Sequence, residues 1–128
     1  MKKSKALIVA GALLASVLLS TEAGAAAKIS NGVACTTKQK NTTKTQVTKD
    51  VTDKYRCTTN PIATGAAKKK LVWVNQDCID MNKLYVDGVA DLAKLKADTT
   101  ATTTQISTQA SFVDSAKTYR SIACGKGF

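Results

Sequence analysis

Histidine is absent from the sequence, and the single glutamate, Glu22, lies within the first 25 residues. Histidine is the usual general base near neutral pH, so a hydrolase of this composition would depend on paired aspartates. The close aspartate pairs in the second half of the chain are Asp77 with Asp80 and Asp87 with Asp91. Both pairs have helical spacing and lysines nearby, which is typical of the solvated face of a helix. No Ser-x-x-Lys, Gly-x-Gly-x-x-Gly or phosphate-loop motif occurs. We therefore expect no enzymatic activity, no catalytic residue and no cofactor.

Apolar runs are also scarce, and the one long run lies near the N-terminus. It spans residues 6–19, follows three lysines within the first five residues, and precedes Ala23-Gly24-Ala25, a small-x-small cleavage signature. The alternative is a membrane anchor, but fourteen residues at ~1.5 Å each fall short of the ~30 Å hydrocarbon core. We expect residues 1–25 to be a cleaved signal peptide, with the cut after Ala25 or at the next one or two alanines. The mature protein would then have no transmembrane anchor and would be secreted, extracellular or held in the cell envelope.

Cysteine occurs four times, all beyond the predicted signal peptide, at Cys35, Cys57, Cys78 and Cys124. An even number of cysteines in a small exported chain is typical of disulfide bonds, which add the constraint that a modest core needs. A structural zinc site needs closely spaced ligand pairs, and the sequence has neither a Cys-x-x-Cys pair nor a histidine. We therefore expect two disulfides and no metal site.

Residues 26–74 form a predicted basic β and loop module. Residues 36–52 are a polar run of mostly threonine, lysine and glutamine, for which a long hairpin arm, a mobile loop and a weak helix are the alternatives. Because β-branched threonine disfavours a helix, extended structure is favoured. Residues 54–57 and 71–74 predict strands, and Asn60-Pro61 predicts a turn between them.

Residues 75–128 form a predicted antiparallel helical hairpin. Apolar residues recur there at intervals of three and four in two stripes. The first stripe comprises Met81, Leu84, Tyr85, Val89, Leu92 and Leu95, and the second comprises Ile106, Ala110, Phe112, Val113, Ala116, Tyr119 and Ala123. Between the stripes, residues 99–104 are poor in helix formers and suit a turn. The alternative is one long helix from Asp77 to Cys124.

The cysteine positions favour the hairpin. A hairpin brings Cys78 and Cys124 to the same end of the helix pair, whereas a single helix would hold them ~70 Å apart, far beyond the ~7 Å limit for bridged α-carbons. We therefore predict the disulfides Cys78–Cys124 and Cys35–Cys57. The predicted fold class is α+β, with a small disulfide-bonded β unit followed by a disulfide-closed antiparallel helical hairpin.

Three short motifs in the first half carry a resemblance to a known module. They are Gly32-Val33-Ala34-Cys35, Tyr55-Arg56-Cys57-Thr58 and Lys70-Leu71-Val72-Trp73. This succession resembles the small two-cysteine module of actinobacterial exported and cell-surface proteins, whose pattern is Cys, then Tyr-x-Cys, then Leu-x-Trp. The resemblance covers residues 32–73 and implies an envelope setting and a small disulfide-bonded β unit. It implies no particular activity.

The net charge of the chain is +10, and the excess beyond the signal peptide lies in the first half. Residues 26–73 contain ten basic residues and two aspartates, whereas residues 74–128 contain six residues of each sign. A positive field concentrates polyanions. The candidate polyanion-binding residues are Lys38, Lys40, Lys44, Lys49, Lys54, Arg56, Lys68, Lys69 and Lys70. The alternative is that these side chains only keep a threonine-rich surface soluble.

We predict a secreted or cell-envelope binding module without enzymatic activity. Its expected partners are an anionic cell-wall polymer, a polysaccharide or a lipid headgroup, bound through the basic half. One alternative is a secreted inhibitor or effector that acts on a protein partner, and another is a subunit of a surface polymer. Trp73, the single tryptophan, could stack on a ligand, but a lone tryptophan in a small domain is more often part of the core.

Overall fold

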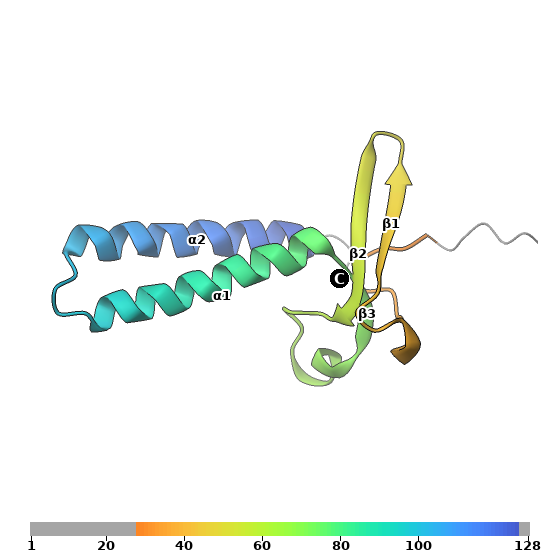
Figure 1. Cartoon of the computed structure of the whole chain (residues 1–128), viewed down its shortest axis with the longest axis horizontal. Helices are drawn as coiled ribbons and strands as arrows, with labels where there is room; N and C mark the ends of the chain where they lie inside the picture. Colours follow the sequence, from red (N-terminus) through yellow and green to blue (C-terminus); the bar gives the residue numbers. More distant parts are fainter. Residues whose placement is uncertain (1–27, 126–128) are drawn as a thin grey trace, which may run out of the picture.

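The computed structural model describes residues 28–125, which form a three-stranded antiparallel sheet followed by two long helices (Figure 1). The strands are β1 (Thr43–Thr48), β2 (Val51–Thr59) and β3 (Leu71–Asn75), in the spatial order β1-β2-β3, and the helices are α1 (Gln76–Ala97) and α2 (Thr103–Gly125). The predicted fold class is confirmed. The predicted signal peptide, residues 1–25, lies outside the described residues. No helix within residues 28–125 is long and apolar enough to cross a membrane.

Strands β1 and β2 form a long hairpin from most of the threonine-rich run. Their antiparallel register extends from Thr43 opposite Arg56 to Thr48 opposite Val51. Lys49, with a φ of 45°, begins the two-residue turn at the tip. β-Branched threonine side chains fit a pleated strand, so extended structure prevails over the helix and loop alternatives from residue 43 onward. In Figure 1 the tip of this hairpin stands clear of the rest of the protein.

One face of the sheet carries the first hydrophobic core. The core comprises buried Tyr55, Cys57 and Trp73, with half-buried Ile29, Cys35 and Leu71 packed against them. Trp73 lies opposite Cys57 in the register and is only 4% exposed, so the tryptophan is a core residue. The Cys35–Cys57 disulfide, with α-carbons 6.0 Å apart, ties the N-terminal segment to β2. Residues 32–35 run along the outer edge of β3, where the Trp73 backbone N–H donates to the Val33 carbonyl at 2.8 Å.

The other face of the sheet meets the helices through a second core. Val74 follows Trp73 in β3, so its side chain points to the opposite face. Val74, Cys78 and Cys124 are fully buried, and the half-buried residues around them are Ile62, Val72, Ile79 and Ala123. The Cys78–Cys124 disulfide, with α-carbons 4.6 Å apart, joins the start of α1 to the end of α2. Both predicted disulfides are therefore confirmed, and the helical hairpin is closed at the end that contacts the sheet (Figure 1).

A short turn joins the antiparallel helices, which excludes the single long helix. Asp98 follows α1, and its carboxylate accepts hydrogen bonds from the Thr100 hydroxyl at 2.7 Å and the Thr100 backbone N–H at 2.8 Å. These two bonds lower the pKa of Asp98. Thr102 and Gln105 then form a capping box, in which Thr102 Oγ1 accepts from the Gln105 N–H and Gln105 Oε1 accepts from the Thr102 N–H. The stretch predicted as a turn therefore supplies the turn and also the cap of α2.

The contact between α1 and α2 is narrower than the predicted apolar stripes. Gly88 in α1 and Val113 and Ala116 in α2 are buried. Tyr119 and Phe112, which belong to the second stripe, are 61% and 41% exposed. Each helix has a single helical neighbour, so one side of each stripe has nothing to pack against. Tyr119 is therefore mostly exposed, whereas the Phe112 ring lies against Gly88 of α1 and is less than half exposed.

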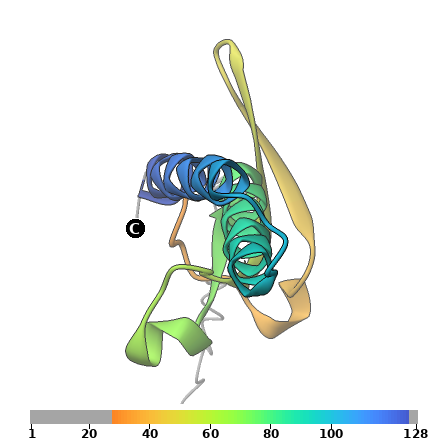
Figure 2. The ribbon, with the colours of Figure 1, turned by 90° about the vertical axis from the view of Figure 1, so that its left-hand side faces the viewer.

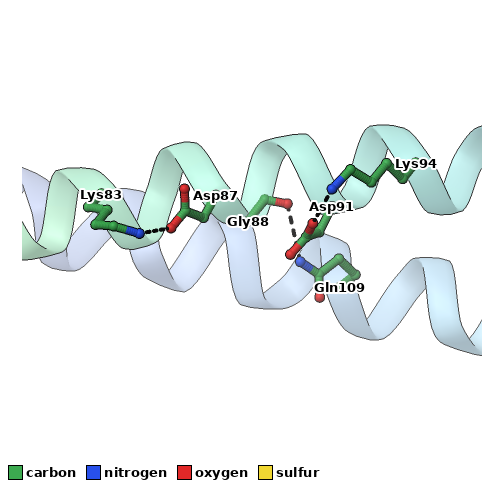
Figure 3. A network of polar contacts seen from close by, with 6 residues as sticks. All are labelled: Lys83, Asp87, Gly88, Asp91, Lys94 and Gln109. Carbon is green, nitrogen blue, oxygen red and sulfur yellow. Dashed lines mark hydrogen bonds and ion pairs between the residues drawn. The ribbon is translucent and has the colours of Figure 1, made fainter.

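Two ion pairs lie on the exposed side of α1 (Figure 3). Lys83 pairs with Asp87, and Lys94 pairs with Asp91 at 3.2 Å. The hydrogen bond to the Asp87 carboxylate, together with its charge, raises the pKa of Lys83. Asp87 and Asp91 thus occupy a solvated helix face, and two of the α1 lysines have a local counter-charge.

Gly88 sets the closest approach of the two helices, and its substitution tests this packing. A Cβ at residue 88 would lie 2.9 Å from Phe112 Cε1, while the Gly88 carbonyl accepts a bond from Gln109 Nε2 at 3.1 Å (Figure 3). We expect Gly88→Leu to lower the free energy of unfolding by about 1–3 kcal/mol, because the helices must separate. Gly88→Ala should stay within about 1 kcal/mol of the parent, because the helix propensity of alanine offsets a small movement of the exposed Phe112 ring.

Urea unfolding followed by circular dichroism measures both changes. The matched control is Ala93→Leu, which places the same leucine side chain at an exposed position of α1. A Gly88→Leu protein as stable as the Ala93→Leu protein would contradict the close packing at residue 88.

Candidate functional site

The structure distributes the predicted polyanion-binding residues over both faces and both ends of the β unit. Lys54 and Arg56 are two residues apart in β2 and share one face of the sheet, whereas Lys44 lies opposite Tyr55 on the other face. The Lys44 ammonium lies 5.3 Å from the centroid of the Trp73 ring, an attractive cation–π contact. These three side chains therefore do not form a single patch.

The remaining candidates lie at the ends of the β unit. Lys49 is in the hairpin turn, and Lys38 and Lys40 lie in and just after the 3-10 helix η1 (Thr37–Gln39). The consecutive lysines 68–70 end the 3-10 helix η2 (Gly65–Lys69) and lead into β3. Figures 1 and 2 both show the hairpin tip and η2 at opposite ends of the sheet. Lysines 68–70 are the longest run of consecutive candidate charges.

None of the nine candidate residues forms an ion pair within residues 28–125, where the ion pairs are those of Lys83 and Lys94 in α1. Eight of the nine are exposed and Arg56 is half-buried. The β unit has only Asp50 and Asp53 as local acids. Its positive charge is therefore largely unneutralised, in contrast to that of α1.

A hollow of about 700 Å³ adjoins the 68–70 lysines. It is lined by Ser30, Asn31, Gly32, Val33, Asn60, Ala63, Ala67, Lys70 and Val72, and we call it the Lys70 hollow. Asn60 Oδ1 accepts the Ile62 N–H at 3.0 Å, which leaves the amide nitrogen of Asn60 as a donor. With the Ser30 hydroxyl and the Lys70 ammonium, the hollow offers hydrogen-bond donors and no carboxylate. Its chemistry suits an anionic or hydroxyl-rich ligand.

A second hollow, of about 470 Å³, lies where β2 passes the start of α1 and the end of α2. It is lined by Asn31, Val51, Asp53, Tyr55, Asn75, Asp77, Met81, Tyr119, Ile122 and Ala123, and we call it the Asp53–Asp77 groove. Asn75 connects its acidic residues, because Asn75 Oδ1 accepts the Asp77 N–H at 2.8 Å and Asn75 Nδ2 lies 3.4 Å from Asp53 Oδ1. This groove contains two carboxylates and no basic side chain.

The groove is not predictable from the sequence. The spacing of Asp77 and Asp80 predicts a solvated helix face, the apolar periodicity places Tyr119 in a stripe, and Asp53 is one of two aspartates in a basic region. The alternation of Val51, Asp53 and Tyr55 was the available signal, since residues two apart in a strand share a face. No sequence pattern indicated that these three β2 residues lie beside α2.

No protein-family model, curated protein or solved structure matches the chain. The resemblance of residues 32–73 to the actinobacterial two-cysteine module therefore stays a prediction. The functional assignment rests on the geometry and charge of the two hollows and of the β unit.

Proposed function

We propose that this protein is a non-enzymatic binding module of the cell envelope or extracellular space that binds anionic polymers through its basic β unit. The observation that carries the proposal is the set of nine exposed or half-exposed basic side chains without an acidic partner in the described part of the chain. Two disulfides support an oxidising compartment, and the expected signal peptide supports export.

The dispersed arrangement of the charges favours a polymer over a small anion. A contact between exposed charges contributes only ~0.2–1 kcal/mol, so no single lysine of the β unit holds a monovalent anion. A flexible polyanion can contact lysines at both ends and on both faces of the sheet, and these small contributions then act together. The Lys70 hollow would accept one sugar unit of such a polymer, with lysines 68–70 close to its charged group.

The test is binding of the protein starting at Ala26 to an acidic polysaccharide such as polygalacturonate, with glycerol-phosphate polymer and phosphatidylglycerol vesicles as separate arms. The variant carries Lys68→Gln, Lys69→Gln and Lys70→Gln. The matched control carries Lys94→Gln, Lys96→Gln and Lys117→Gln, which removes the same charge from exposed helical positions. We expect the 68–70 variant to bind about tenfold more weakly and the control to change about twofold or less.

Salt gives a second readout of the same proposal. The screening length falls from ~10 Å at ~0.1 M to ~3 Å at ~1 M salt, so binding through exposed charges should be lost across this range. Absence of binding at low salt, or binding that neither salt nor the 68–70 substitutions weaken, would leave the lysines as solubilising charge. Equal weakening by both triple substitutions would make net charge, and not the Lys70 hollow, the determinant.

A further inference from the structure

The Asp53–Asp77 groove has a charge opposite in sign to the net charge of the chain. It is lined by the carboxyl groups of Asp53 and Asp77, and no lysine or arginine lines it. The start of α1 adds roughly half a positive charge from the helix dipole, which two full negative charges outweigh. The groove is therefore a local negative site in a chain with a net charge of +10.

Two basic side chains that neighbour groove residues in the sheet register or the sequence, Lys44 and Arg120, are held by aromatic rings. Lys44 lies opposite Tyr55, but its ammonium sits over the Trp73 ring at 5.3 Å. Arg120 follows Tyr119, but its guanidinium lies 3.9 Å from the centroid of the Tyr85 ring, and its Nη1 is 3.4 Å from Asn82 Oδ1. Neither cation neutralises the two carboxylates.

The rest of the groove is apolar and incompletely covered. Val51, Tyr119 and Ile122 line it and are 56%, 61% and 55% exposed. They come from β2 and from the last turns of α2, and the Cys78–Cys124 disulfide holds the end of α2 beside the sheet. An apolar rim beside carboxylates matches a ligand that presents a cation next to an apolar group.

We propose that the Asp53–Asp77 groove binds a peptide segment of a protein partner in which an arginine or lysine adjoins a large apolar side chain. The cation would contact Asp53 and Asp77, and the apolar side chain would cover Val51, Tyr119 and Ile122. A volume of about 470 Å³ lies in the range of sites that hold a drug-sized ligand, which is room for more than one side chain. This site is independent of the polyanion-binding proposal, because its ligand has the opposite charge and it uses none of the candidate lysines.

The test titrates the isotope-labelled protein starting at Ala26, disulfides intact, with a terminally blocked tetrapeptide that has arginine and phenylalanine at its centre. Nuclear magnetic resonance should show shifts at the amides of the groove residues. A peptide with glutamate in place of the arginine should not bind. A peptide with serine in place of the phenylalanine should bind several-fold more weakly.

Two variants separate the acidic and apolar parts of the groove. Asp53→Asn with Asp77→Asn should weaken the arginine–phenylalanine peptide about three- to tenfold. Asp91→Asn with Asp114→Asn, which changes net charge equally at exposed helical positions, should change it less than about twofold. Ile122→Ser should weaken the arginine–phenylalanine peptide but not the arginine–serine peptide, because Ile122 contacts only the apolar side chain.

Ile122 is exposed, so its substitution should leave the unfolding midpoint nearly unchanged, and each variant is compared at equal folded fraction. Shifts confined to other parts of the protein, or equal binding of the glutamate peptide, would overturn the proposal. So would binding of butylguanidinium as tight as that of the peptide, because the groove would then be a site for small cations. The result of the polymer-binding test with the 68–70 variant does not affect these outcomes, because none of lysines 68–70 lines the groove.

Discussion

Replacing Cys78 and Cys124 together by alanine should lower the free energy of unfolding by about 4 kcal/mol. The bridge closes a loop with a sequence separation of 46 residues, for which the loss of chain entropy in the unfolded state amounts to about 4 kcal/mol. Both sulfurs are also fully buried beside Val74, so their removal loosens the core that joins the sheet to the helices. This is the largest effect that we expect from any change in the helical half.

Without the bridge, we expect the two helices to unfold at lower urea concentrations than the sheet. The helical hairpin extends away from the sheet and meets it only at the disulfide-closed end (Figure 1). Without the bridge, the remaining second-core contacts of Val74, Ile79 and Ala123 are what holds the ends of α1 and α2 to the sheet. Amide hydrogen exchange should therefore show loss of protection in α1 and α2 at urea concentrations at which β2 and β3 stay protected.

The comparison variant replaces Cys35 and Cys57 by alanine. That bridge closes a shorter loop, with a separation of 22 residues, and its removal should cost about 3 kcal/mol, with the loss of protection in the β unit. Urea unfolding provides the free energies for both variants. A Cys78 and Cys124 variant that loses less than about 1 kcal/mol, or that first loses protection in β2, would contradict the anchoring role of this disulfide.

Helix geometry made the disulfide pairing predictable. A hairpin brings Cys78 and Cys124 to one end of the helix pair and a single straight helix does not, so the sequence favoured the hairpin and this bridge. Cys35 and Cys57 were then the remaining pair. The threonine content similarly favoured extended structure over a helix in residues 36–52. This is confirmed in β1 and β2 but wrong at Thr37–Gln39, which forms the 3-10 helix η1. These predictions depended on local backbone preferences and on the distance that a disulfide can span. Both can be worked out from the residue positions in a single sequence.

The surfaces were harder to predict, because they depend on which segments meet. Strand alternation shows that Lys54 and Arg56 share a face, but only the register with β1 places Lys44 on the opposite one. Tyr119 belongs to an apolar stripe, yet its ring lies beside β2 in the groove because the helix contact is narrow. The groove joins parts of the chain separated by more than forty residues, and no local pattern indicates such a contact.

Trp73→Ala should cost about 3–5 kcal/mol, the usual range for removing a large buried aromatic side chain. Trp73 is 4% exposed and packs with Tyr55 and Cys57, next to the Cys35–Cys57 disulfide. Its loss would leave a cavity at the centre of the β unit and remove the ring beneath the Lys44 ammonium. Trp73→Phe, which fills part of that cavity, should cost clearly less.

Urea unfolding of both Trp73 variants, together with polygalacturonate binding measured on the folded fraction, distinguishes a core role from a ligand platform. A core residue predicts a large loss of stability and only a small change in the affinity of the molecules that remain folded, since Lys44 is the one candidate residue within residues 28–125 with a cation–π contact to the ring. A stacking platform predicts the reverse, a small loss of stability with a large loss of affinity. If Trp73→Ala proved as stable as the parent and failed to bind the polymer, Trp73 would be part of the binding surface and not only a core residue. The basic residues alone would then not account for polymer binding.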